Sequence, residues 1–98
     1  MSEFDYQQID EIIHSRIRLA ILSVLLTVEQ AEFTFLKEKV NATDGNLSIH
    51  LKKLEEVGYI SVTKEFLDRK PRSIYQMTPV GHKAFAAYIQ KLESLLKK

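Results

Sequence analysis

The 98-residue sequence predicts one mainly helical domain, 1–98, of the α+β class, in which a small β-hairpin lies between helices. Three observations predict it. Apolar residues recur every three or four positions over 16–28 and 45–56, which indicates amphipathic helices. After Gly58 the apolar period changes to two, which is typical of a half-buried strand. Thr78-Pro79 then predicts a further helix, because a capping threonine precedes a proline at the first helical position, where an N–H is not needed.

The first third of the chain is expected to form two helices. A short first helix is predicted over Tyr6–His14, where isoleucines recur at helical spacing. Ser15 is a suitable N-cap for a second helix, Arg16–Val28, because its hydroxyl can accept a free N–H of the first turn. The apolar residues of this second helix form the stripe of a core helix: Ile17, Ile21, Val24, Leu25 and Val28.

A short strand and a short helix are predicted next. The chain becomes extended near Phe33, after a polar connection. Thr34 then resembles a cap for a helix over Phe35–Val40, whose Leu36 and Val40 lie on one face. Only two or three residues separate this helix from the following one, as a helix-turn-helix requires.

The third long helix is predicted over Gly45–Glu56, with Thr43 or Asp44 as its cap. Gly58 stands where a C′ glycine ends a helix. One stripe faces the core: Leu47, Leu51 and Leu54. The order predicted for the whole chain is therefore helix, helix, strand, helix, helix, strand, hairpin loop, strand, helix.

The hairpin is predicted from two strands and the polar segment between them. Ile60–Glu65 alternates apolar and polar residues, and Ser73–Met77 is rich in β-branched and aromatic residues. Phe66–Pro71 forms the expected tip. The last helix is expected to run to about Leu96, and its apolar residues have the 3-4-3 spacing of an interacting helix: Phe85, Tyr88, Leu92 and Leu95.

Composition excludes several classes of function. There is no cysteine, so disulfides, thiolate zinc sites and cysteine nucleophiles are excluded. His14, His50 and His82 are spread over three predicted helices and form no ligand pair, so no metal or other cofactor is expected. No glycine-rich phosphate loop or nucleophile-base-acid set indicates an enzyme. No apolar run is long enough to cross a membrane, and the acidic N-terminus is not a secretory signal, so we expect a cytoplasmic protein.

Charge gives a mixed signal. The net charge is only +1, which argues against a nucleic-acid binder unless the cations are clustered. The acidic residues Asp5, Asp10 and Glu11 lie far in sequence from a basic cluster at the hairpin tip, 67–72. The near-neutral net charge therefore averages an acidic N-terminal segment and a basic hairpin tip.

The helix over 44–56 carries the candidate DNA-reading face. Opposite its leucine stripe lie small, polar and basic residues: Gly45, Asn46, Ser48, Ile49, Lys52, Lys53 and Glu56. Asn46 can pair with adenine, Ser48 with a base edge or phosphate, and Ile49 can contact a thymine methyl. The two lysines suit phosphates. The alternative is an ordinary solvated face, but the tight turn before this helix and the basic hairpin after it favour DNA.

The hairpin tip carries three cations in four positions: Arg69, Lys70 and Arg72. Basic loops of this kind can enter a narrow minor groove, whose negative potential attracts arginine. The alternative is a hairpin edge kept soluble by its charges.

Three stretches resemble the ArsR/MarR-type winged helix-turn-helix transcriptional regulators. They are Leu47-Ser48-x-His50-Leu51-x-x-Leu54-x-x-x-Gly58-Tyr59-Ile60, Arg72-Ser73-x-Tyr75-x-Met77-Thr78-x-x-Gly81, and His14-Ser15-Arg16-Ile17-Arg18-x-x-Ile21-Leu22. The resemblance covers about 9–96. It implies a homodimer on a pseudo-palindromic site, with the third helix in the major groove and the hairpin as a wing at the minor groove or backbone. It also implies backbone contacts from Arg16 and from Thr34 or Lys37. The metal-sensing members use cysteine clusters, which this sequence does not have.

The C-terminal helix is predicted to dimerise. Its apolar residues are too many to pack inward on one small core: Phe85, Tyr88, Ile89, Leu92, Leu95 and Leu96. The first helix is the expected second contributor, through Ile9, Ile12 and Ile13. The alternative is that both helices pack on each other within one chain.

We therefore expect a homodimeric, sequence-specific double-stranded DNA-binding regulator, with repression as the first expectation. The low net charge keeps open a winged-helix protein interaction module without DNA binding. Any small-molecule effector would occupy the dimer interface, and nothing in the sequence identifies one.

Overall fold

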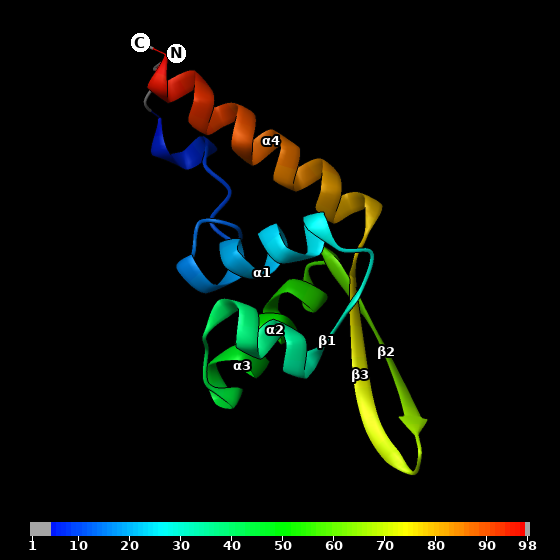
Figure 1. The fold of residues 1–98 in the computed structure, drawn as a ribbon. Coiled ribbons are helices and arrows are strands. Elements are labelled where there is room, and N and C mark those ends of the chain that lie inside the picture. Colours follow the sequence, from blue (N-terminus) through cyan, green and yellow to red (C-terminus); the bar gives the residue numbers. More distant parts are fainter. Residues whose placement is uncertain (1–4, 98) are drawn as a thin grey trace.

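The computed structural model describes residues 5–97, and its elements follow the predicted order except at the N-terminus (Figure 1). Over these residues it contains one 3-10 helix, four α-helices and a three-stranded antiparallel sheet. The elements are η1 (Tyr6–Gln8), α1 (Arg16–Thr27), β1 (Ala31–Glu32), α2 (Phe33–Val40), α3 (Asp44–Glu56), β2 (Ile60–Leu67), β3 (Lys70–Met77) and α4 (Pro79–Leu96). The α+β winged helix fold predicted from the sequence is confirmed.

The predicted first helix, Tyr6–His14, is wrong. Only the three residues of η1 are helical, and irregular turns follow them. The Asp10 carboxylate accepts the backbone N–H groups of Ile12 at 2.8 Å and Ile13 at 3.1 Å. Such a local side-chain bond competes with helical hydrogen bonding. The Nε of Arg18 in α1 donates to the Ile12 carbonyl at 2.5 Å, so this carbonyl also has a tertiary partner.

The helix-turn-helix is formed by α2 and α3, and α2 begins earlier than predicted. Thr34 is its second residue and not its cap; Glu32 precedes the helix without a capping side-chain bond. The reason is tertiary, because Ala31 and Glu32 form β1 by pairing with Tyr75 and Ile74 of β3. At the other end, Asn41 has φ 55 and ends α2 in the left-handed region, which asparagine tolerates better than most residues.

Local signals predicted α3 well. The Thr43 hydroxyl accepts the Asn46 N–H at 3.2 Å, which identifies Thr43 as the cap. Gly58 has φ 80, as expected for a glycine just after a helix. The leucine stripe is buried against α1 and the rest of the core; its members are Leu47, Leu51 and Leu54.

The hairpin is longer and its turn tighter than predicted. Pairing continues to Leu67 and Lys70, so the turn is only Asp68 and Arg69, both with positive φ (51 and 67). A two-residue turn with positive φ at both positions matches the twist of antiparallel strands. Pro71 fits within β3 because β1 pairs only with positions 74–75, which leaves Pro71 on an open edge.

The last helix begins as predicted and then extends away from the helix-turn-helix (Figure 1). The Thr78 hydroxyl accepts the Gly81 N–H at 3.0 Å, and Pro79 is the first helical residue. The N-terminal segment lies along the far half of α4, where Lys91 donates to Gln8 at 2.5 Å.

Candidate nucleic-acid interface

The polar face of α3 is open to solvent. Its exposed members are those predicted from the sequence: Gly45, Asn46, Ser48, Ile49, Lys52 and Lys53. Ile49 is 66% exposed, which is unusual for an isoleucine and is not explained by packing within the chain. The stripe on the other side anchors the helix. An anchored helix with an exposed polar and basic face has the geometry needed to enter a major groove.

Residues near the starts of α1 and α2 are also exposed. Arg16 is the first residue of α1 and Thr34 the second of α2. Lys37 Nζ lies 2.9 Å from the Asp44 carboxylate, so this ion pair connects α2 to the first turn of α3. Both side chains are largely exposed, and exposed pairs are weak, so a phosphate can compete for Lys37.

The hairpin places two of its three predicted cations at the tip. Arg69 lies in the turn and Lys70 directly follows it, and both are exposed. Arg72 does not lie at the tip, contrary to the prediction. It lies further up β3 and binds Glu65 at 2.6 and 2.8 Å and Glu32 at 3.2 Å, contacts that raise the pKa of its guanidinium, the hydrogen bond to Glu65 most. Arg72 therefore ties β2 and β1 to β3, and its charge is already neutralised.

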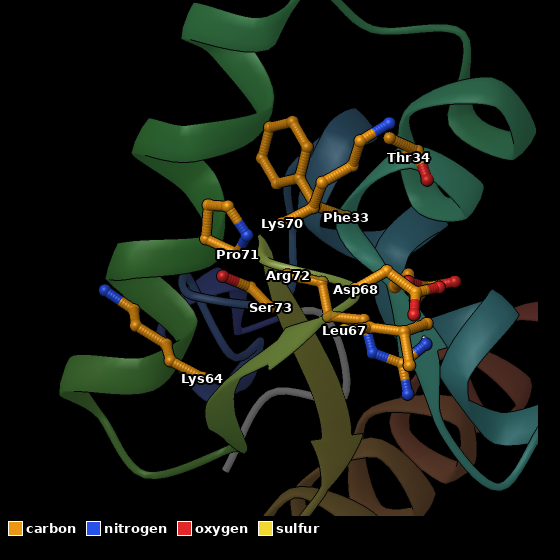
Figure 2. A pocket seen from close by; sticks show the side chains of 10 residues that line it. Phe33, Thr34, Lys64, Leu67, Asp68, Lys70, Pro71, Arg72 and Ser73 are labelled. Carbon is orange, nitrogen blue, oxygen red and sulfur yellow. Dashed lines mark hydrogen bonds and ion pairs between the residues drawn. The ribbon is translucent and has the colours of Figure 1, made fainter.

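An open cavity of about 620 Å³ separates the hairpin from the start of α2. Figure 2 shows Phe33 and Thr34 of α2 facing this space from one side and hairpin side chains bordering it from the other. Lys64 and Lys70 lie at its edge. The hairpin beyond this cavity is free of the helical body, so its end stands clear as a projecting wing.

A link between α1 and α3 was missed by sequence reasoning. Arg18 Nη1 lies 2.9 Å from His50 Nδ1. Arginine has no acceptor, so Nδ1 accepts and the neutral ring carries its proton on Nε2. Burial, and then the Arg18 charge, lower the pKa of His50. His50 is therefore a half-buried, hydrogen-bonded residue beside the leucine stripe of α3.

The lowered pKa of His50 predicts that stability depends on pH. The pKa of His50 lies below its ordinary value of 6.5, so as pH falls from 6.5 toward the lowered value the unfolded chain takes up the proton first. We expect the free energy of unfolding to fall over this window. His50→Gln keeps an acceptor for Arg18 but cannot titrate, so it should flatten this part of a urea-denaturation pH series. An unchanged slope would show that other groups cause the dependence.

Two further contacts attach the N-terminal segment to the domain. Tyr59 donates to the Asp10 carboxylate at 2.6 Å, and His14 Nδ1 lies 2.8 Å from the Tyr88 hydroxyl. Burial first, and then the bond to Asp10, raise the pKa of Tyr59 to about 12. No periodic pattern marks these pairs, because their members are 49 and 74 positions apart.

The predicted dimer surface is only partly available. Three of its members are already buried within this chain: Ile13, Phe85 and Tyr88. Phe85 and Tyr88 of α4 therefore pack inward, contrary to the prediction that they are left over for a partner. Four others are half-buried: Ile9, Ile12, Leu92 and Leu95. Ile89 and Leu96 remain exposed, at 37% and 84%.

Residues 5–97 contain no cluster of histidine and acidic side chains that could hold a metal ion. Over the same range, none of the helices is both long and apolar enough to cross a bilayer.

Comparison with known proteins agrees with the arrangement of helices and hairpin described above. A family model described as a winged helix DNA-binding domain matches residues 17–96. An uncharacterized protein of Methanocaldococcus jannaschii is 42% identical over 87 residues, which cover 89% of this chain and 95% of the relative. A solved transcriptional regulator homologue from Pyrococcus horikoshii OT3 has a TM-score of 0.89 at 27% identity, over 99% of this chain and 96% of that one.

More distant structures share the fold. A solved regulator of the MarR family from Enterococcus faecalis V583 has a TM-score of 0.71 at 23% identity, over 89% of this chain and 74% of that one. At this identity the likeness concerns the arrangement of the helices and the hairpin alone.

Proposed function

Because the chain belongs to the winged helix DNA-binding domain family, we propose that it is a homodimeric transcriptional regulator that binds a specific double-stranded DNA site. One observation carries the proposal. The exposed face of α3 combines a base-pairing amide, Asn46, with phosphate-binding cations, Lys52 and Lys53, on a helix whose opposite stripe is fully buried.

Each side chain then has a role. Asn46 pairs with adenine, Ser48 bonds a base edge or phosphate, and Ile49 contacts a thymine methyl. Gly45 leaves room for close approach of the first turn to the duplex. Lys52 and Lys53 bind phosphates, which position the helix but do not specify sequence.

The surrounding elements extend the contact along the backbone. Arg16 at the start of α1, and Thr34 or Lys37 in α2, bind phosphates beside the major groove. Arg69 and Lys70 place the wing at the adjacent minor groove, where negative potential attracts them. The dimer repeats these contacts on a second half-site about one helical turn away.

Selection of bound sequences from a random DNA pool, at two salt concentrations, tests the proposal. We expect enrichment of a pseudo-palindrome. The logarithm of affinity should fall with the logarithm of salt concentration by about 0.9 for each phosphate contacted. A chain that enriches no sequence and shows no DNA binding at low salt would instead be a winged-helix interaction module.

We expect repression from a bound site, because a dimer that covers promoter DNA excludes the polymerase. Transcription in vitro from a template carrying the selected site measures the direction. More transcript in the presence of the protein would identify an activator.

The dimer is expected to form through α4 and the N-terminal segment. The wild-type chain should sediment as a dimer at micromolar concentration, and Ile89→Glu should shift it to monomer because an unpaired charge is costly at an apolar interface. Val80→Glu is a matched control: Val80 is also exposed on α4 but lies near its start, outside the predicted surface. A wild-type monomer at these concentrations would contradict the prediction.

A further inference from the structure

The end of the hairpin carries large apolar side chains that packing among residues 5–97 does not explain. Phe66 is 76% exposed and Leu67 is 52% exposed, and both precede the turn directly. An exposed phenylalanine on a projecting element is unusual, since aromatic side chains are among the most strongly buried when they serve only the fold. Phe66 is therefore a candidate for contact with a partner.

The strand register decides which way the two side chains point. Phe66 pairs with Pro71, and Leu67 pairs with Lys70. Because successive residues of a strand alternate between faces, Phe66 shares a face with Lys64 and Pro71, whereas Leu67 lies on the other. Figure 2 shows the same division: Lys64, Pro71 and Ser73 lie on one side of the hairpin, and Leu67, Asp68 and Arg72 on the other.

The face of Phe66 belongs to the inner side of the sheet. Six positions closer to the body along each strand lie the buried residues Ile60 and Met77, which share this face by the same alternation. The wing and α3 both lie away from α4 (Figure 1). Phe66 thus ends the face that is turned toward the helix-turn-helix, on the side of the molecule where α3 is exposed.

Cations surround this apolar tip. Lys64, Arg69 and Lys70 make no ion pair with any residue between 5 and 97. Arg72 is neutralised by Glu65 and Glu32, so the free positive charge gathers at the end of the hairpin. An apolar side chain with free cations beside it complements a polyanion that has apolar surface between its charges. Duplex DNA is such a polyanion, because its stacked base pairs lie between charged phosphate backbones.

We propose that the wing inserts Phe66 from the minor groove into a base step and kinks the duplex there. The minor groove is only about 6 Å wide. The two-residue turn keeps the end of the hairpin compact, so that its side chains can reach into this groove. Apolar wedges used in this way partly unstack one step and bend DNA toward the major groove. The preferred step is a pyrimidine–purine step, because such steps unstack most easily.

This inference rests on the proposed DNA binding but goes beyond it. Arg69 and Lys70 alone would bind a narrow groove without changing the path of the duplex. A wedge adds deformation, so the site would show preference at base pairs that α3 does not contact.

The test uses the full-length chain and the duplex most enriched in the selection, carrying a donor and an acceptor dye at its ends. Wild type should bend this duplex by roughly 20–90° and so raise energy transfer. Phe66→Ala should abolish the bend and lower affinity about tenfold. Phe66→Leu should keep part of the bend, because leucine also serves as a wedge.

Leu67→Ala is the matched control, since it removes a neighbouring exposed apolar side chain from the opposite face. It should leave the bend unchanged. A fluorescent adenine analogue at the central step should brighten with wild type and Leu67→Ala but not with Phe66→Ala.

The outcomes are separable. Salt-dependent binding without a bend, or a bend that survives Phe66→Ala, overturns the wedge and leaves the proposed function intact. Loss of the dimer in Phe66→Ala, measured by sedimentation, would assign Phe66 to contact with a second copy and also overturns the wedge. The absence of any DNA binding by wild type overturns both proposals.

Discussion

Gly81→Ala is expected to lower the free energy of unfolding by about 1–3 kcal/mol, as overpacking at a rigid site does. A Cβ at Gly81 would overlap the backbone carbonyl oxygen of Tyr59 and come within 2.9 Å of its carbon and 3.0 Å of Met77 Cγ. The Met77 side chain can move, but the Tyr59 carbonyl cannot easily do so. It accepts the Thr78 N–H at 3.1 Å, where β2 and β3 meet the start of α4.

Urea denaturation followed by far-ultraviolet circular dichroism measures this loss. Gly45→Ala is the matched control, since Gly45 is also helical but has nothing within 4 Å of a new Cβ. Alanine should leave stability unchanged there, or raise it by up to about 1 kcal/mol, because glycine is a poor helix former. Equal stability of Gly81→Ala and wild type would show that α4 does not approach Tyr59 so closely in solution.

Asn46→Ala is expected to cost about 1–3 kcal/mol of binding free energy at the selected site and to relax the preference for adenine at one position of each half-site. The reason is that a bidentate amide–adenine pair discriminates between bases, whereas a phosphate contact does not. Asn46 is exposed in the first turn of α3, so its removal leaves the helix and its leucine stripe intact. The substitution keeps the backbone N–H of this residue, which donates to the capping hydroxyl of Thr43.

Titration of labelled duplexes, matched and mismatched at that position, gives both quantities. Lys53→Ala serves as the comparison. It should weaken all duplexes alike and reduce the salt slope by about 1, as the loss of one phosphate contact requires. If Asn46→Ala leaves affinity and preference unchanged, Asn46 does not read a base, and another residue of the α3 face must do so.

The sequence by itself determined the long helices, because their signals are local. Ser15, Thr43 and Thr78 accept N–H groups three residues ahead of them, and Gly58 takes the left-handed conformation after α3. These caps act through bonds within one turn of chain, and the apolar period between them depends only on helix geometry. For the same reason, the division of α3 into a buried stripe and an exposed face followed from residue spacing alone.

The tertiary structure alone decided the features that depend on partners distant in sequence. Isoleucine spacing predicted a helix over Tyr6–His14, but Asp10, Arg18 and Tyr59 hold that segment in turns. The start of α2 depends on pairing of β1 with β3, and the length of the hairpin on cross-strand pairing that no local signal shows.

Tertiary contacts also decided which cations of the hairpin are neutralised by an ion pair. Arg72 is one of three similar cations in the sequence, yet Glu65 and Glu32 neutralise it and leave Arg69 and Lys70 free at the tip. Residues far apart in the chain meet only after folding, and the energies of their contacts outweigh weak local preferences. The tertiary structure therefore determined which cations of the candidate interface are already paired within the chain.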